Sequence, residues 1–194
     1  MAFSFRPGRP RRYDLKPLAG FARRDAARAV AALDELSARL FDLIADLPPA
    51  ALRFCPRRGG NTIAMLVLHM AAAEAHWMAR VTGKPLPPAL ARQLALGLQD
   101  PRGELRRVHL SLQALVGVCR RVRRLTRRRL AALTALDREV PAGRMRLTAR
   151  GVLAHLLWHW TYHTGQVGLL RRLCGARYRW TFGRRLTGEG TARP

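Results

Sequence analysis

Acidic residues and lysine are scarce in this chain of 194 residues. It has 12 Asp and Glu against 36 Lys and Arg, which gives a formal net charge of +24. Only Lys16 and Lys84 are lysines, so 34 of the basic residues are arginines. A surplus of this size attracts polyanions, so nucleic acid or a membrane surface is one candidate partner. We favour the alternative, a compositional bias that scatters arginines over solvated faces.

Cysteine is also scarce, and its spacing argues against two classes of small protein. Cys55, Cys119 and Cys174 lie far apart and form no CxxC pair. This spacing indicates neither a zinc ribbon nor a disulfide framework. The arginine- and proline-containing residues 1–20 also lack the apolar segment of a secretory signal. We therefore expect a protein of the reducing cytoplasm.

Charge is missing from one long stretch near the end of the chain. Residues 151–170 contain no Asp, Glu, Lys or Arg, which superficially resembles a membrane span. Three His, a Gln and two Thr within the stretch argue against that interpretation. A helix buried among other helices explains the pattern better, and we expect no membrane span.

Strand signals are few, and the hydrophobic periodicity predicts an all-α protein, a four-helix bundle with short irregular basic tails. Pro48 and Pro49 end the first helical pattern, Asn61 and Thr62 are both suitable N-caps for the second helix, and Thr148 is one for the last. The long helices are expected over 22–47, 62–81, 104–136 and 149–174, with a shorter one over 89–98. The expected parts of the chain are a basic arm, the bundle and a basic tail: 1–21, 22–175 and 176–194.

Three histidines recur every four residues in the last predicted helix. His155, His159 and His163 therefore lie one turn apart on one face of that helix. Two such imidazoles can share a metal ion, but a catalytic site needs three protein ligands and an open position. His69 interrupts the apolar stripe of the second helix and is the candidate third ligand. Spacing alone leaves two alternatives open, a metal site or histidines that are simply satisfied within the core.

Two segments of the chain resemble the DinB/YfiT-like superfamily. The second helix and the residues before it read GGNTIAMLVLHMAAAEAHWM, and the last helix reads HLLWHWTYHTGQVGLLRRLCG. The first is similar to the superfamily's pattern of a small or polar start followed by sIxxLxxH. The second is similar to its HxxxHxxxHxGQ signature. The order, the spacing and the number of helices agree over about residues 22–175.

The resemblance implies a set of ligands and a type of chemistry. It identifies His69, His159 and His163 as ligands of a divalent metal, zinc or nickel first, with iron and manganese as further candidates. Some members of the superfamily are transferases or isomerases that use low-molecular-weight thiols, and many form dimers. The resemblance thus implies a metal-dependent enzyme that acts on a small electrophilic molecule, as a homodimer in many members. No catalytic residue beyond the ligands is identified.

Two further polar residues accompany the predicted ligands on the last helix. Gln166 lies nearly one turn after His163, where it can bond a ligand histidine or a metal-bound water, or simply pack between helices. His155 is expected to support or pack against the ligands and not to bind the ion.

Other residues have less specific expectations. Glu74 is expected to be solvated, with a place beside the metal site as the alternative. Trp158 and Trp160 are expected to pack. The arginine run 120–129 is expected to be a solvated face, with polyanion binding as the alternative. A second functional hypothesis follows from that alternative, a non-enzymatic nucleic-acid or polyanion-binding bundle in which the metal is structural.

Overall fold

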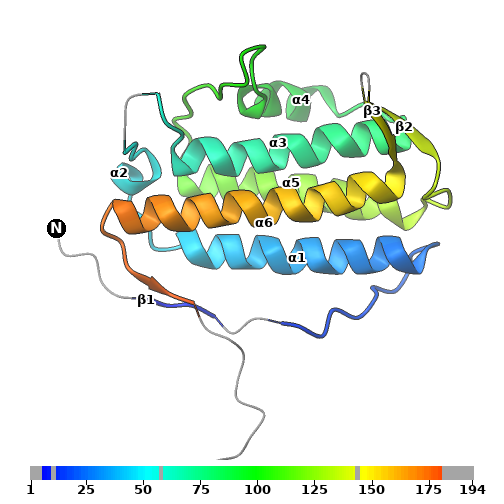
Figure 1. The fold of residues 1–194 in the computed structure, drawn as a ribbon, viewed down its shortest axis with the longest axis horizontal. Coiled ribbons are helices and arrows are strands. Elements are labelled where there is room, and N and C mark those ends of the chain that lie inside the picture. Colours follow the sequence, from blue (N-terminus) through cyan, green and yellow to red (C-terminus); the bar gives the residue numbers. More distant parts are fainter. Residues whose placement is uncertain (1–5, 10–11, 57–58, 143–144, 181–194) are drawn as a thin grey trace, which may run out of the picture.

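The computed structural model describes residues 6–9, 12–56, 59–142 and 145–180 (Figure 1). This part of the chain is mainly helical, which confirms the predicted all-α class. Its long helices are α1 (Arg24–Ile44), α3 (Ile63–Thr82), α5 (Leu112–Ala131) and α6 (Ala149–Leu173). Short helical elements are α2 (Pro49–Leu52), α4 (Pro88–Leu94) and the 3-10 turn η1 (Ala95–Gly97).

The four long helices lie side by side around one apolar core. α3 packs against α5 and α6, and α1 packs against the same two helices (Figure 1). α5 and α6 consequently lie at opposite corners of the arrangement. Each helix contributes fully buried leucines to the shared core, among them Leu33, Leu66, Leu115 and Leu156. This packing sets α6 directly beside α3, so side chains of these two helices can meet.

The predicted helix starts at two threonines are confirmed by their capping hydrogen bonds. The Thr62 hydroxyl accepts the backbone N–H of Met65, and the Thr148 hydroxyl accepts that of Gly151. Each cap satisfies one of the amides that the first turn of a helix leaves unpaired. These caps set the start of α3 and α6, the two helices that carry the histidines.

The predicted helix over 104–136 begins too early. The observed α5 starts after Ser111, whose hydroxyl caps it by accepting a backbone N–H in the first turn. The preceding segment instead folds back on itself, because Leu105 bridges to Gln99 and the Asp100 carboxylate accepts two backbone N–H groups. The apolar residues of that segment had suggested helical periodicity, but local side-chain hydrogen bonds favour a loop.

Two pairs of short strands lie outside the helices in the described part of the chain. The link before α6 forms a hairpin of β2 (Glu139–Ala142) and antiparallel β3 (Met145–Thr148). The tails were expected to be irregular, yet β1 (Arg6–Pro7) pairs in parallel with β4 (Tyr178–Arg179). The Tyr178 hydroxyl also donates to Asp42 on α1, which holds the start of the tail against the helices. The tail beyond 180 lies outside the described residues.

The uncharged stretch 151–170 lies within α6, as predicted. One side of this helix is buried by α1 and α3, but the opposite side exposes large apolar side chains. Across the described residues, the structure contains no helix that combines the length and the apolar character needed to cross a membrane.

Candidate metal centre

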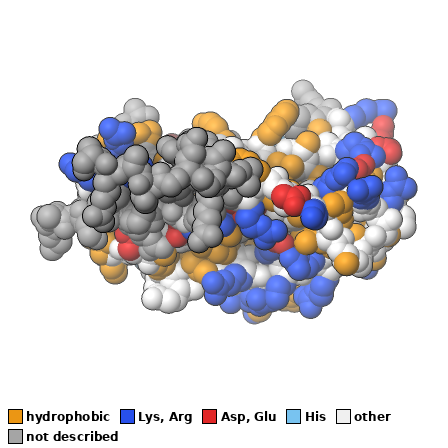
Figure 2. Space-filling view, turned by 90° about the horizontal axis from the view of Figure 1, so that it is seen from below, with side chains coloured by type: hydrophobic (Ala, Val, Ile, Leu, Met, Phe, Trp, Pro, Cys, Tyr) orange, Lys and Arg blue, Asp and Glu red, His pale blue; other side chains and the backbone are white. Residues whose placement is uncertain are grey.

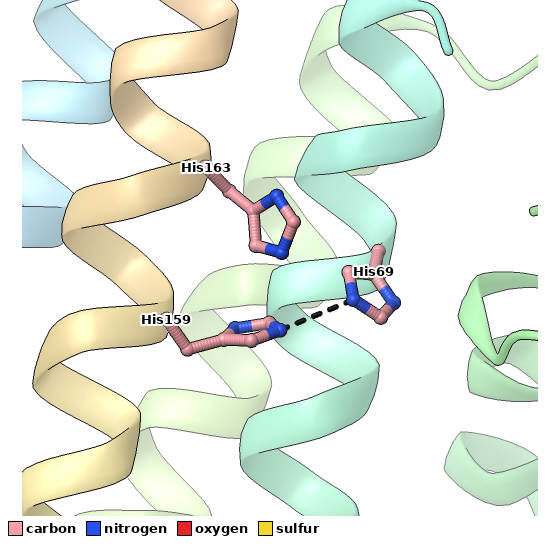
Figure 3. A group of neighbouring side chains, drawn as sticks. All are labelled: His69, His159 and His163. Carbon is pink, nitrogen blue, oxygen red and sulfur yellow. Dashed lines mark hydrogen bonds between the residues drawn. The ribbon is translucent and has the colours of Figure 1, made fainter. Parts of the chain in front are cut away.

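Three histidines from two helices converge between α3 and α6 (Figure 3). His69 comes from α3, and His159 and His163 come from successive turns of α6. One ring nitrogen of each lies within 4.8 Å of those of the other two. The structure thus brings together the three residues that the sequence singled out, although His69 is 90 residues from His159 along the chain.

The orientation of His69 is set by a backbone carbonyl. Its Nδ1 lies 2.9 Å from the carbonyl oxygen of Gly97, in η1. A carbonyl oxygen can only accept, so Nδ1 carries the proton and Nε2 keeps its lone pair. That lone pair faces the other histidines, as a metal ligand requires.

Gln166 has the corresponding role for His163. The Nδ1–H of His163 donates to the amide oxygen of Gln166 over 2.7 Å. The two residues are three apart on α6, so they are neighbours on the helix surface. The sequence had placed Gln166 beside a ligand histidine, and the structure gives it this contact. The Nε2 of His163 is left available as a ligand atom.

His159 lies closest to His69, with the two Nε2 atoms 3.1 Å apart. Since the Nε2 of His69 is a bare lone pair, the facing nitrogen must either carry a proton or share a cation with it. The other nitrogen of His159, Nδ1, is buried and has no hydrogen-bond partner in the described part of the protein. A cation shared by the two Nε2 atoms would satisfy both lone pairs, whereas the unpartnered Nδ1 of His159 lacks the second hydrogen bond that His69 and His163 make.

Burial keeps all three imidazoles neutral. It lowers the pKa of His159 from 6.5 to about 3, with smaller contributions from nearby His163, His69 and His155. Burial also lowers the pKa of His69, partly opposed by the bond to Gly97, and that of His163, partly opposed by the bond to Gln166. Neutral imidazole is the form that binds metal, so the site is ready for a cation at neutral pH.

The remaining histidines of the two helices lie outside the cluster. His155 is half-buried, and its ring lies 5.7 Å from that of Trp77 and 5.7 Å from that of His159. This packing agrees with a supporting position. His76 is exposed and accepts a hydrogen bond from Arg80.

The expectation of a solvated Glu74 is wrong. Its side chain is fully buried, and both carboxylate oxygens accept hydrogen bonds from Arg123, at 2.9 and 2.7 Å. The Thr126 hydroxyl donates a third hydrogen bond, at 2.7 Å. Arg123 is correspondingly an exception to the solvated arginine face predicted for 120–129. The partners come from different helices, so the periodicity of either segment could not reveal the pair.

The two tryptophans of α6 behave differently. Trp160 is buried, as predicted, and the guanidinium of Arg123 lies 5.0 Å from its ring centre. Trp158 was expected to pack, but 75% of its surface is exposed. Residues two apart on a helix point in nearly opposite directions, so a single face cannot bury both.

Sequence reasoning missed Gly97. A Cβ placed there would lie 2.7 Å from the carbonyl oxygen of Leu68 and 3.0 Å from the Cβ of Ala72. Only glycine therefore allows η1 to lie so closely on α3, and this contact brings the Gly97 carbonyl to His69. The ALGLQD segment carries no local signal of this role, since the constraint comes from a helix earlier in the chain.

A hollow of about 410 Å³ is lined by Gln166, which contacts His163, but by none of the three histidines themselves. Its walls are the loop before α3 and the outer part of α6, and Gln166 forms one side. The residue that orients His163 thus also faces a space large enough for a small molecule.

The fold and the cluster define an all-helical protein with a three-histidine centre between two helices. A family model, the DinB superfamily, matches residues 32–167. This match covers more than half of the chain, and the protein belongs to the DinB superfamily. A search of the curated proteins found no match to this chain.

Proposed function

We propose that this DinB protein is a four-helix bundle that binds one divalent metal ion through His69, His159 and His163. The observation that carries the proposal is the convergence of three neutral imidazoles within 4.8 Å. Two of these rings already donate their Nδ1–H to oxygen acceptors, which leaves Nε2 for the ion. Zinc or nickel suits an all-imidazole site best, and iron or manganese is a further candidate.

The further proposal is a metal-dependent transferase or isomerase that uses a low-molecular-weight thiol and acts on a small electrophile. Three protein ligands leave coordination positions open for a reactant. When bound, the ion would lower the pKa of a coordinated thiol or water and so supply a nucleophile at neutral pH.

The protein's own contribution would be orientation and the exclusion of water. Gly97 and Gln166 hold two rings in one tautomer, and burial keeps the three rings uncharged. Glu74 is not available as a general base, because its carboxylate is fully engaged by Arg123 and Thr126. Proton transfer would therefore depend on the substrates or solvent.

Metal analysis of the purified protein tests the proposed ligands. We expect about one divalent ion per chain, as for a single three-ligand site. His69→Ala, His159→Ala and His163→Ala should each lose the ion. His155→Ala is the matched control, because it removes an imidazole from the same face of α6 without touching the cluster, and it should keep the ion. Metal retained after replacement of two of the three proposed ligands would refute the site.

A screen of small electrophiles with different thiols tests the proposed reaction separately. Activity should need both the thiol and the metal, disappear with a chelator and return when the ion is restored. It should also be absent in His163→Ala. A protein that holds its metal but transforms no electrophile with any thiol would leave the metal site standing and contradict the thiol chemistry.

The outer face of α5 supports a second candidate function, polyanion binding. Arg120, Arg124 and Arg128 are exposed on this helix and form no ion pair with an acidic residue of the described part. α5 lies at the corner opposite α6, away from the histidines. Figure 2, viewed from the α1 side, shows many more Lys and Arg than Asp and Glu side chains on the described surface. In this alternative the metal would be structural.

The salt dependence of DNA affinity distinguishes polyanion binding by α5 from a surplus of arginines that is only compositional. If phosphates contact the α5 face, the logarithm of DNA affinity should fall steeply with the logarithm of salt concentration. Replacing the three α5 arginines by Gln should reduce that slope, whereas a control with equal loss of charge should reduce it less. The control replaces three exposed arginines elsewhere by Gln: Arg53, Arg102 and Arg146. Equal slopes for both variants would exclude a specific role for α5.

A further inference from the structure

A hollow opens between α1 and α5, on the edge of the bundle opposite the histidines. Its volume is about 310 Å³, within the range of about 300 to 1,000 Å³ that small-molecule pockets occupy. α3 meets α6 at one edge of the bundle, and α1 meets α5 at the other (Figure 1). The hollow and the proposed metal centre therefore lie on different sides of the core.

Each of the two helices lines the hollow with one face. The lining residues follow the spacing i, i+3, i+4 and i+7 in both helices: Asp34, Ser37, Ala38 and Phe41 from α1, and Arg120, Arg123, Arg124 and Arg127 from α5. Packed helices usually place apolar side chains at these positions. Here α1 supplies two small side chains at the centre of its face and α5 supplies four guanidiniums, so the helices leave a space between them.

The arginines of the hollow outnumber their acidic partners. Asp34 pairs with both Arg123 and Arg127, and the buried Glu74 pairs with Arg123 from the side of the core. These two carboxylates balance two of the four guanidiniums. The other two arginines form no ion pair with an acidic residue in the part of the chain that the structure describes. The hollow therefore has two positive charges that the protein itself does not balance.

Buried polar groups and an aromatic ring both line the hollow. Arg123 and Ser37 are buried, and the guanidinium is fixed by its bonds to Glu74 and, at 2.6 Å, to the Ser37 hydroxyl. Phe41 is half-buried, and the guanidinium of Arg120 lies 5.8 Å from the centre of its ring. A guanidinium held on an aromatic face keeps its N–H groups free to bind an anion. The hollow thus combines positioned cations with an apolar wall.

We propose that this hollow binds a small organic molecule that carries a doubly charged anionic head, such as a phosphate monoester, on a flat apolar body. The two unbalanced guanidiniums match the charge of about −2 that a phosphate monoester carries at neutral pH. The planar fork of arginine also matches pairs of phosphate oxygens. The apolar body would lie against Phe41 and over the small side chain of Ala38. Polyanion binding by α5, by contrast, needs exposed charge but no hollow.

Calorimetric titration with phenyl phosphate tests the site. The protein is first freed of metal by dialysis against a chelator, so that the phosphate cannot bind an ion at the histidines. Inorganic phosphate should bind about tenfold more weakly than phenyl phosphate, because it lacks the ring. Arg120→Gln should weaken phenyl phosphate binding about tenfold, as expected for the loss of a hydrogen bond between charged groups. Arg128→Gln is the matched control, because it removes the same charge from the same helix outside the hollow, and its affinity should be unchanged.

Ala38→Phe separates a small-molecule site from a polyanion-binding face. The added ring fills the hollow without a change of charge, so phenyl phosphate binding should be lost while DNA affinity stays the same, and circular dichroism verifies that the helices form.

Four outcomes would overturn the proposal. They are the absence of phenyl phosphate binding at millimolar concentration, equal affinity for inorganic phosphate, equal losses in Arg120→Gln and Arg128→Gln, and a folded Ala38→Phe protein that still binds phenyl phosphate or loses DNA affinity in parallel. None of them depends on whether the three histidines bind metal, so this test and that of the metal site are independent.

Discussion

At the residue scale, the proposed metal centre depends on two acceptors that are not themselves proposed ligands. The Gly97 carbonyl and the Gln166 amide oxygen hold the Nδ1 protons of His69 and His163. A ligand imidazole with its second nitrogen bonded in this way is fixed in tautomer and orientation. The orientation of the Nε2 atoms of His69 and His163 therefore depends on these two acceptors as well as on the histidines themselves.

Gly97→Ala should weaken metal binding. The added Cβ would approach the Leu68 carbonyl oxygen to 2.7 Å, so η1 must move away from α3 and carry its carbonyl away from His69. We expect a loss of about 10- to 100-fold in metal affinity, typical for losing the hydrogen bond behind a ligand. Competition with a chromogenic chelator measures it.

Gly117→Ala provides the comparison for that variant. A Cβ at Gly117 meets only the flexible end of Arg121, at 3.5 Å, and the residue lies on α5, away from the histidines. Its metal affinity should equal that of the original protein. If Gly97→Ala also binds as tightly as the original protein, the carbonyl of Gly97 does not orient His69.

At the scale of helices, a buried ionic network joins α3, α5 and α1. Arg123 on α5 donates to Glu74 on α3 and, at 2.6 Å, to the Ser37 hydroxyl on α1. Its guanidinium also faces the ring of Trp160 on α6. One side chain thus contacts the three other long helices. Such a pair specifies how helices align, since a buried charge without its partner is strongly unfavourable.

Glu74→Gln should destabilise the protein by about 3 kcal/mol, because it removes the buried counter-charge of Arg123 and leaves only the more exposed Asp34, at 3.4 Å, as its acidic partner. Chemical denaturation monitored by circular dichroism measures the change in the free energy of unfolding. Glu139→Gln is a suitable control, because the pair of Glu139 with Arg146 is solvent-exposed and contributes little.

A double variant separates the charge effect from the loss of packing. Glu74→Leu combined with Arg123→Met removes both charges together and should recover much of the stability lost in Glu74→Gln. The double variant also loses the hydrogen bonds of Arg123 with Ser37 and of Thr126 with Glu74. If it is less stable than Glu74→Gln, these hydrogen bonds stabilise the folded protein by more than is gained by removing the buried charge of Arg123.

At the scale of the whole molecule, the buried histidines couple stability to pH. The pKa of each of His69, His159 and His163 is lower in the folded protein than its ordinary value of 6.5. Well above pH 6.5 these rings are neutral in both the folded and the unfolded chain and add no pH dependence. As the pH falls below 6.5, the unfolded chain takes up protons that the folded chain does not bind, so unfolding becomes more favourable.

The free energy of unfolding of the metal-free protein should therefore fall between about pH 7 and about pH 5. The contribution of His159 should continue to be lost down to about pH 3, where its folded form is protonated. Denaturation in chelator at a series of pH values measures the slope. His159→Gln should show a shallower slope over the same range, and an unchanged slope would show that His159 is not buried as a neutral ring.

Local patterns in the sequence were enough to predict the long helices and part of the candidate site. Helical periodicity and caps such as Thr62 and Thr148 predicted the long helices, because these features act within a few residues of one another. The spacing of His159 and His163 likewise placed two rings on one face. Where the pattern failed, as in the segment before Ser111, a side chain competed locally for the backbone.

Only the tertiary structure decided which distant residues meet. The contacts of Gly97 with His69 and of Arg123 with Glu74 join residues 28 and 49 positions apart, and no periodicity within one helix encodes such pairs. The same holds for the exposure of Trp158, which depends on which side of α6 the neighbouring helices cover. The sequence by itself determined the helices and the candidate ligands. Helix packing decided which polar groups are buried, what orients them and which apolar face stays open, because burial is a property of the assembled molecule.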